Sequence, residues 1–149
     1  MEILNLHQNK ISNINLLEDI KFKELKELNL GENKISDIRV LEKLKFEKLE
    51  ILELDHNKIS DISVLENIKF KELKKLNLRG NKISDIKVLE KFEFEKLEIL
   101  ELGFNKISDI SVLDKVNLRN LKLLDLKYNL FIDIGILKSK IRKDIIRWK

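Results

Sequence analysis

An asparagine that recurs every 24 residues constrains this chain more than any other feature. The spacing runs unbroken through the sequence, at Asn9, Asn33, Asn57, Asn81, Asn105 and Asn129. Around each asparagine the sequence follows the pattern L-x-x-L-x-L-x-x-N-x-I, with Met1 replacing the first leucine of the first copy and Phe131 replacing the last isoleucine of the last copy. Self-similarity at one fixed period is typical of repeat proteins, in which each copy packs mainly against its neighbours. We therefore expect six stacked copies rather than a globular core.

This pattern, in six in-phase copies, resembles that of the leucine-rich repeat family. The resemblance covers residues 1–137, which we interpret as one leucine-rich repeat array. It implies an α/β solenoid of six 24-residue copies, with a parallel sheet on the concave face and short helices on the convex face.

The second copy shows what each segment of a repeat is expected to do. Leu28 and Leu30 share one face of a short strand, because side chains alternate along a strand. Asn33 has the donors and the acceptor needed to satisfy backbone groups of its own turn and of the next one. Asp37 is a suitable N-cap for a short helix over residues 38–44.

Opposite charges alternate at the second position of successive copies. The residues at this position are Glu2, Lys26, Glu50, Lys74, Glu98 and Lys122. We expect opposite charges to face each other across every strand pair, where they favour the correct register. The alternation also indicates that the unit of duplication is two copies, or 48 residues.

The two ends of the chain lead to different expectations. Met1 occupies the first repeat position, although terminal repeats normally carry a polar cap. We expect a fragment of a longer array or an engineered protein, whose uncapped N-terminal repeat associates end to end with another copy. At the other end, residues 138–149 read KSKIRKDIIRWK. With Leu137, the apolar residues Ile141, Ile145 and Trp148 fall at helical spacing. We predict a C-terminal capping helix there, although a basic amphipathic helix can also bind a membrane or a partner.

Composition narrows the range of partners. The chain has no cysteine, and therefore no disulfide or thiolate site. It has neither a signal-peptide pattern nor a run of apolar residues long enough for a membrane span, so we expect a cytoplasmic protein that does not bind membranes. The net charge of +4 comes from residues 138–149, which carry +5, so the repeats are nearly neutral and we expect no nucleic-acid partner.

No group of residues has the spacing that catalysis or cofactor binding requires. His7 and His56 lie two copies apart, with no third ligand at metal-binding spacing. The Asp55–His56 pair has no serine or cysteine nucleophile near it. The four glycines are isolated, so they form no phosphate-binding loop. We therefore expect no enzymatic activity, no metal and no cofactor.

The candidate protein-binding residues occupy the variable positions of the strands. In leucine-rich repeats these positions form the concave face, which usually binds partners. They are the third, fifth, seventh and eighth positions of each copy. The candidates, which combine apolar, aromatic and charged side chains, are Phe104, Tyr128, Ile99, Leu123, Glu101, Asp125, Arg79, Lys127, Asp55, Glu53 and Ile51.

Phe104 and Tyr128 are the predicted centre of this surface. Both occupy the eighth position, in adjacent copies, so we expect their rings to lie within about 5–7 Å of each other. Gly103 should leave a recess beside Phe104, because it has no side chain. Ile51, Ile99 and Leu123 should be exposed and form an apolar group with these two rings, in which Ile99 and Leu123 extend the floor. Aromatic anchors within a polar rim are typical of binding hot spots.

Three functions are compatible with this pattern. The first is a protein-binding scaffold whose partner is another protein. The second is a structural spacer, or a consensus-like designed solenoid, without a specific partner. The third follows from the segment N-x-I-x-x-I-x-x-L, which resembles the subclass typified by the regulatory subunit of type 1 protein phosphatase. That subunit binds its enzyme through the concave face.

Overall fold

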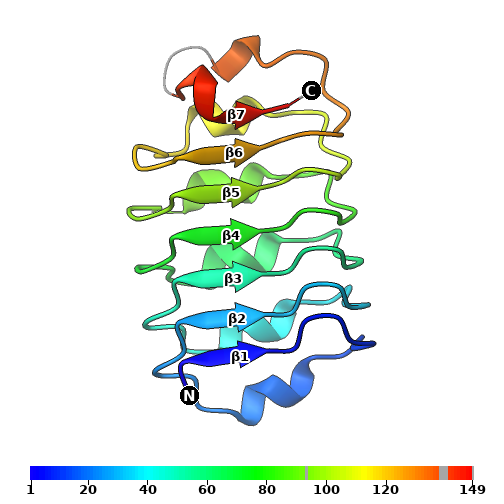
Figure 1. Cartoon of the computed structure of the whole chain (residues 1–149), viewed down its shortest axis with the longest axis vertical. Coiled ribbons are helices and arrows are strands. Elements are labelled where there is room, and N and C mark those ends of the chain that lie inside the picture. The colour runs from blue at the N-terminus through cyan, green and yellow to red at the C-terminus, as the bar shows by residue number, and fades with distance from the viewer. Residues whose placement is uncertain (93, 138–140, 149) are drawn as a thin grey trace.

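The computed structural model describes residues 1–92, 94–137 and 141–148. These residues form seven parallel strands that stack in chain order along the long axis of the molecule (Figure 1). The strands are β1 (Ile3–Asn5), β2 (Glu27–Asn29), β3 (Ile51–Glu53), β4 (Lys75–Asn77), β5 (Ile99–Glu101), β6 (Leu123–Asp125) and β7 (Ile146–Arg147). From β1 to β6, residues 24 positions apart pair across neighbouring strands, as Leu28 does with Leu52. Equivalent positions therefore form straight rows, which confirms an α/β solenoid of 24-residue repeats.

The repeats also contain short 3-10 helices, which lie behind the strands in the view of Figure 1. They are η1 (Asn15–Asp19), η2 (Arg39–Lys43), η3 (Ser63–Asn67), η4 (Lys87–Lys91), η5 (Ser111–Asp114), η6 (Gly135–Leu137) and η7 (Lys143–Ile145). The short helix predicted over residues 38–44 is confirmed as η2, but it ends earlier because Leu44 already has extended backbone. No helix in the described part of the chain is long and apolar enough to cross a lipid bilayer.

Asp37 has a different role from the predicted N-cap. The helix begins after Ile38, and no side chain caps it. Instead, the Asp37 carboxylate accepts a hydrogen bond from the Arg39 N–H at 2.9 Å, which forms a turn just before the helix. The same bond recurs at Asp61, Asp85, Asp109 and Asp133. The aspartate therefore fixes the approach of the chain to the helix.

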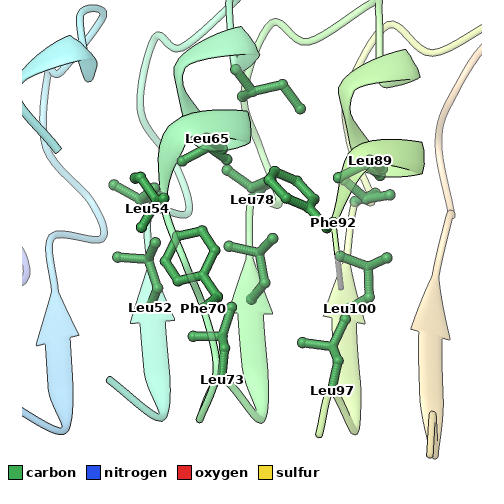
Figure 2. Packing of buried hydrophobic residues seen from close by; sticks show 14 of the residues in the cluster. Leu52, Leu54, Leu65, Phe70, Leu73, Leu78, Leu89, Phe92, Leu97 and Leu100 are labelled. Atoms are coloured by element: carbon green, nitrogen blue, oxygen red, sulfur yellow. The ribbon is translucent and has the colours of Figure 1, made fainter. Parts of the chain in front are cut away.

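The core fills the space between the strands and the helices, as Figure 2 shows for repeats three to five. The leucines at the fourth and sixth positions of repeats two to six are all fully buried. Phenylalanines extend the core between the helices and the next strand, and Phe70 and Phe92 meet edge to face with ring centroids 6.2 Å apart. In the first repeat, Leu4 and Leu6 are only partly buried, whereas Phe22 is buried. Each repeat is thus buried mainly by its neighbours.

The repeated asparagine links each turn to the turn before it. The Asn57 amide donates to the backbone oxygen of Leu30 in the preceding repeat at 2.9 Å. It also donates to the oxygens of Leu54 and Asp55 in its own turn, and its Oδ1 accepts from the Ile35 N–H at 2.9 Å. The predicted role is confirmed, but the neighbour is the preceding turn and not the next one. A buried apolar residue would leave these backbone groups unsatisfied.

The predicted capping helix covers residues 138–149, and the described part of this range, residues 141–148, does not form it. Residues 138–140 and 149 lie outside the described residues, and the remainder forms η7 and then β7, which pairs with β6. The Leu126 N–H donates to the Arg147 oxygen at 2.6 Å. An extended segment can satisfy the unpaired backbone groups at the edge of β6, which a helix cannot do. The side chains of this segment that pack on the core are Ile141, Ile145, Ile146 and Trp148.

The predicted charge ladder consists of separate ion pairs. In each pair a lysine contacts the glutamate of the preceding repeat. The pairs are Lys26–Glu2 at 3.1 Å, Lys74–Glu50 at 2.7 Å and Lys122–Glu98 at 2.8 Å. Among the described residues, no ion pair joins Lys26 to Glu50 or Lys74 to Glu98. Direct ion pairs therefore close every second step of the ladder, whereas at the other steps opposite charges lie next to each other without a direct contact.

Candidate functional site

Phe104 and Tyr128 form a stacked aromatic pair on the concave face. Their ring centroids are 4.2 Å apart, and the ring planes are tilted by 36°. This contact confirms the predicted proximity and is closer than expected. Phe104 is 40% exposed and Tyr128 is 65% exposed, so both rings are accessible to a partner. We refer to these two residues as the aromatic pair.

A left-handed backbone at the eighth position sets the direction of both side chains. All six copies have φ between 49° and 68° there, at Gln8, Glu32, His56, Gly80, Phe104 and Tyr128. This conformation costs a residue other than glycine about 1 kcal/mol. Stacking of the repeats stabilises this backbone conformation, because the backbone N–H of Phe104 donates a hydrogen bond to the backbone oxygen of Lys127 in the next repeat at 2.7 Å. Sequence reasoning missed this feature, for which Gly80 was the one available signal.

Arg79 and Asp125 hold the aromatic pair from the side of Phe104. The Arg79 guanidinium carbon lies 4.3 Å from the centroid of the Phe104 ring. Its Nη1 donates to Asp125 Oδ2 at 2.7 Å, and Asp125 is only 4% exposed. A Cβ on Gly103 would lie 3.0 Å from this Asp125 oxygen and 3.2 Å from Arg79 Nη1. The recess predicted at Gly103 was therefore wrong, because Arg79 and Asp125 fill that space.

Lys75 is a site residue that the list of candidates missed. Its Nζ lies 2.6 Å from Glu53 Oε1 and 3.5 Å from Glu101 Oε1, so it bridges β3 and β5. Partial burial alone would lower the pKa of Lys75, but the bonds to the two glutamates outweigh burial and raise it. The signal in the sequence was a lysine at the third position of repeat four. The repeats before and after it carry isoleucine at that position and glutamate at the fifth position.

Asp55 belongs to a second group, away from the aromatic pair. A Cβ on Gly31 would lie 2.4 Å from Asp55 Oδ1 and 2.9 Å from His7 Nδ1, so these two side chains converge above Gly31. His7 also lies 3.8 Å from Glu32. Burial, and next the charge of Glu53, raise the pKa of Asp55. Asp55 is thus separate from the candidates around the aromatic pair.

The apolar side chains near the aromatic pair are less exposed than predicted. Ile51, Ile99 and Leu123 are half-buried and not fully exposed. Ile99 and Leu123 are neighbours across β5 and β6, whereas Lys75 separates Ile51 from Ile99. Lys127 is also half-buried at the end of β6, and its N–H donates to Asp125 Oδ1 at 3.0 Å. Ile99 and Leu123 therefore lie side by side on the strands, and Ile51 lies apart from them.

Comparison with known families agrees with this architecture. A family model described as leucine-rich repeats in two copies matches residues 23–67, 47–91 and 71–115, which together cover more than half of the chain. The chain belongs to the leucine-rich repeat family. Comparison with curated protein sequences finds no significant match.

Leucine-rich repeat proteins of two bacteria have similar solved structures. The internalin InlF of Listeria monocytogenes is 31% identical with a TM-score of 0.72, and the match covers 93% of this chain and 45% of InlF. Internalin C2 of the same species is 27% identical with a TM-score of 0.76, covering 100% of this chain and 71% of that one. A leucine-rich repeat protein of Leptospira interrogans is 31% identical with a TM-score of 0.72, covering 98% and 36%. The chain therefore spans less than half the length of two of these proteins.

These matches support the family but not the phosphatase-regulator subclass. Leucine-rich repeat proteins are in general interaction scaffolds rather than catalysts. Among the described residues, no three His, Cys, Asp or Glu side chains come together in a way that could hold a metal ion.

Proposed function

We propose that this leucine-rich repeat protein binds another protein through its concave face, at a site centred on the aromatic pair. The observation that carries the proposal is the stacking of two exposed rings at 4.2 Å, with Arg79 on the Phe104 ring and Asp125 holding Arg79. Exposed aromatic side chains within a polar rim are what binding hot spots contain. Among the eighth positions, only those of the last two repeats are aromatic.

The rigidity of the aromatic pair favours binding over a purely structural role. Rings that are already fixed by neighbours lose little side-chain freedom when a partner covers them. Phe104 is fixed by Tyr128 on one side and by Arg79 on another. A spacer would gain nothing from exposed aromatic side chains, which a polar residue such as Gln8 replaces in the first repeat.

Affinity capture from a lysate of the source organism tests the proposal with three forms of the chain. These are the unchanged chain, the Phe104→Ala/Tyr128→Ala variant, and the His7→Ala/Gln8→Ala variant as a matched control at the other end. Proteins bound at the proposed site should be retained by the control and lost from the first variant by about 30-fold or more, the effect of one hot spot.

Circular dichroism of each variant checks that the fold is unchanged. Equal losses for the two double variants, or no loss for either, would contradict the proposal and favour the structural spacer.

A further inference from the structure

Charge is unevenly distributed along the concave face. At the third, fifth, seventh and eighth positions, repeats one to three carry no lysine or arginine but four carboxylates, Glu27, Glu32, Glu53 and Asp55. At the same positions, repeats four to six carry three basic residues, Lys75, Arg79 and Lys127, against two acidic ones, Glu101 and Asp125. The face is therefore acidic in its N-terminal half and slightly basic in the half that holds the aromatic pair.

The basic residues of this face are largely engaged with acidic neighbours. Arg79 is paired with Asp125, and Lys75 is shared between Glu53 and Glu101. Lys75 leaves Glu53 incompletely satisfied, since its buried Oε2 has no hydrogen-bond partner among the described residues.

The remaining carboxylates lack a basic partner. In the described part of the chain, no lysine or arginine forms an ion pair with Glu27, Glu32 or Asp55, and Glu32 has only His7 at 3.8 Å. Asp55 is in addition partly desolvated and close to Glu53, and both effects disfavour its ionised form. Repeats two and three therefore present carboxylates that no described lysine or arginine pairs with, and the basic groups nearby are the imidazoles of His7 and His56.

We infer that the partner presents an extended segment that lies along the concave face, with an apolar or aromatic side chain on the aromatic pair and lysine or arginine side chains over repeats two and three. This inference rests on the proposed function and specifies the chemistry of the partner. Charge complementarity selects the occupant, because a cation at the acidic end adds attraction that a neutral or acidic segment lacks. A polyanion such as a nucleic acid would be repelled there.

The geometry of the sheet sets the spacing of such a segment. Neighbouring strands lie about 4.8 Å apart, and the midpoint of the aromatic pair is three repeats from the midpoint of Glu32 and Asp55, which corresponds to roughly 14 Å. An extended peptide rises about 3.3–3.5 Å per residue. The anchoring side chain and the basic side chains should therefore be about four residues apart in the partner.

Selection from a random library of twelve-residue peptides on the immobilised full chain tests the inference. We expect the enriched peptides to carry an apolar or aromatic residue with lysine or arginine about four positions away. A fluorescently labelled enriched peptide is then titrated against variants at low and high salt.

Three double variants separate the contributions to binding. Glu32→Gln/Asp55→Asn should weaken binding about 3- to 10-fold at low salt and less at high salt, as expected for exposed charge pairs. Phe104→Ala/Tyr128→Ala should weaken it more, at both salt concentrations. Glu47→Gln/Glu95→Gln, which removes the same charge from exposed positions outside the concave face, should have no effect.

The outcomes distinguish this inference from the proposed function. Enriched peptides that depend on the aromatic pair, but carry no basic residue or bind Glu32→Gln/Asp55→Asn normally, would overturn the inference and leave the proposed function intact. Enrichment of acidic peptides would overturn it in the same way. If no peptide distinguishes the chain from its Phe104→Ala/Tyr128→Ala variant, both fail.

Discussion

Arg79 bonds to Asp125 across a complete repeat. The two residues are 46 positions apart in sequence, and Arg79 Nη1 lies 2.7 Å from Asp125 Oδ2. The seventh position of the repeat between them is Gly103, where any side chain would meet both groups. His7 and Asp55 converge above Gly31 in the same way, two repeats apart. Glycine at position 103 thus allows a polar contact to span three repeats, and this part of the concave face is fixed over a longer distance than the backbone ladder alone provides.

Replacing Gly103 by alanine should separate Arg79 from Asp125. The new methyl group would lie 3.0 Å from the Asp125 carboxylate, which is buried and cannot move freely. We expect the free energy of unfolding to fall by about 1–2 kcal/mol, as for other overpacked sites. Urea unfolding measures the change. In an Asp125→Ala background the same substitution should cost much less, and equal costs in both backgrounds would show that the clash lies elsewhere.

Replacing Gly80 by alanine should destabilise the protein for two separable reasons. Gly80 has φ of 68°, which alanine adopts at a cost of about 1 kcal/mol. The methyl group would also lie 2.6 Å from His56 Nδ1. We expect a total loss of about 1–2 kcal/mol in urea unfolding. The substitution made in a His56→Ala background should retain only the backbone part, and a loss that disappears completely would rule out the strain argument.

Replacing Asn57 by alanine should be far more harmful than replacing Asn9. The buried Asn57 amide satisfies three backbone oxygens and one N–H, and their loss should cost about 2–3 kcal/mol. Asn9 is exposed and donates only to Leu6 and His7 of its own turn, where water can replace it. Its replacement should cost less than about 1 kcal/mol. Thermal or urea unfolding compares the two variants, and similar losses would mean that burial does not decide the effect.

The regular part of the fold could be predicted because one period controls it. A strict 24-residue spacing of Asn33, Asn57 and Asn81 is compatible only with strands in register, and the sheet has that register. The C-terminal segment could not be predicted in this way. Ile141, Ile145 and Trp148 have helical spacing, but the open edge of β6 binds the segment as β7. Such competition between local pattern and tertiary pairing is not visible in periodicity.

The candidate site was predictable only where it follows the repeat phase. Phe104 and Tyr128 occupy equivalent positions in adjacent repeats, so their contact follows from the period. The Arg79–Asp125 pair does not, because it joins different positions two repeats apart and depends on the direction of both side chains. The same holds for Lys75 between Glu53 and Glu101.

The Asp37→Asn substitution should make the free energy of unfolding depend less on pH in the acidic range. The side-chain hydrogen bond from Arg39, followed by the backbone N–H of Arg39, lowers the pKa of Asp37 from 3.8 to about 2. Its ionised form therefore stabilises the fold above pH 4, and this contribution is lost as the pH falls toward 2. Asp37→Asn should lower the free energy of unfolding at pH 7, and this loss should become smaller as the pH falls toward 2. Asparagine preserves the turn, as Asn13 does in the first repeat, so a loss that is as large at pH 2 as at pH 7 would contradict this explanation.

The Asp55→Asn substitution should raise the free energy of unfolding at pH 7, whereas Asp37→Asn should lower it. Burial and the neighbouring Glu53 raise the pKa of Asp55 above its usual value of 3.8, so the folded state binds the proton more tightly than the unfolded chain does. Stability from this group is present below pH 4 and is lost as the pH rises through the folded pKa. Asp55→Asn should therefore increase the free energy of unfolding at pH 7, and urea unfolding should show the gain disappearing at lower pH. A gain that is independent of pH, or a loss at pH 7, would mean that the ionised carboxylate of Asp55 does not destabilise the folded state. If the gain accompanies weaker binding of basic peptides, the protein retains an unfavourable charge at Asp55 because its partner neutralises it.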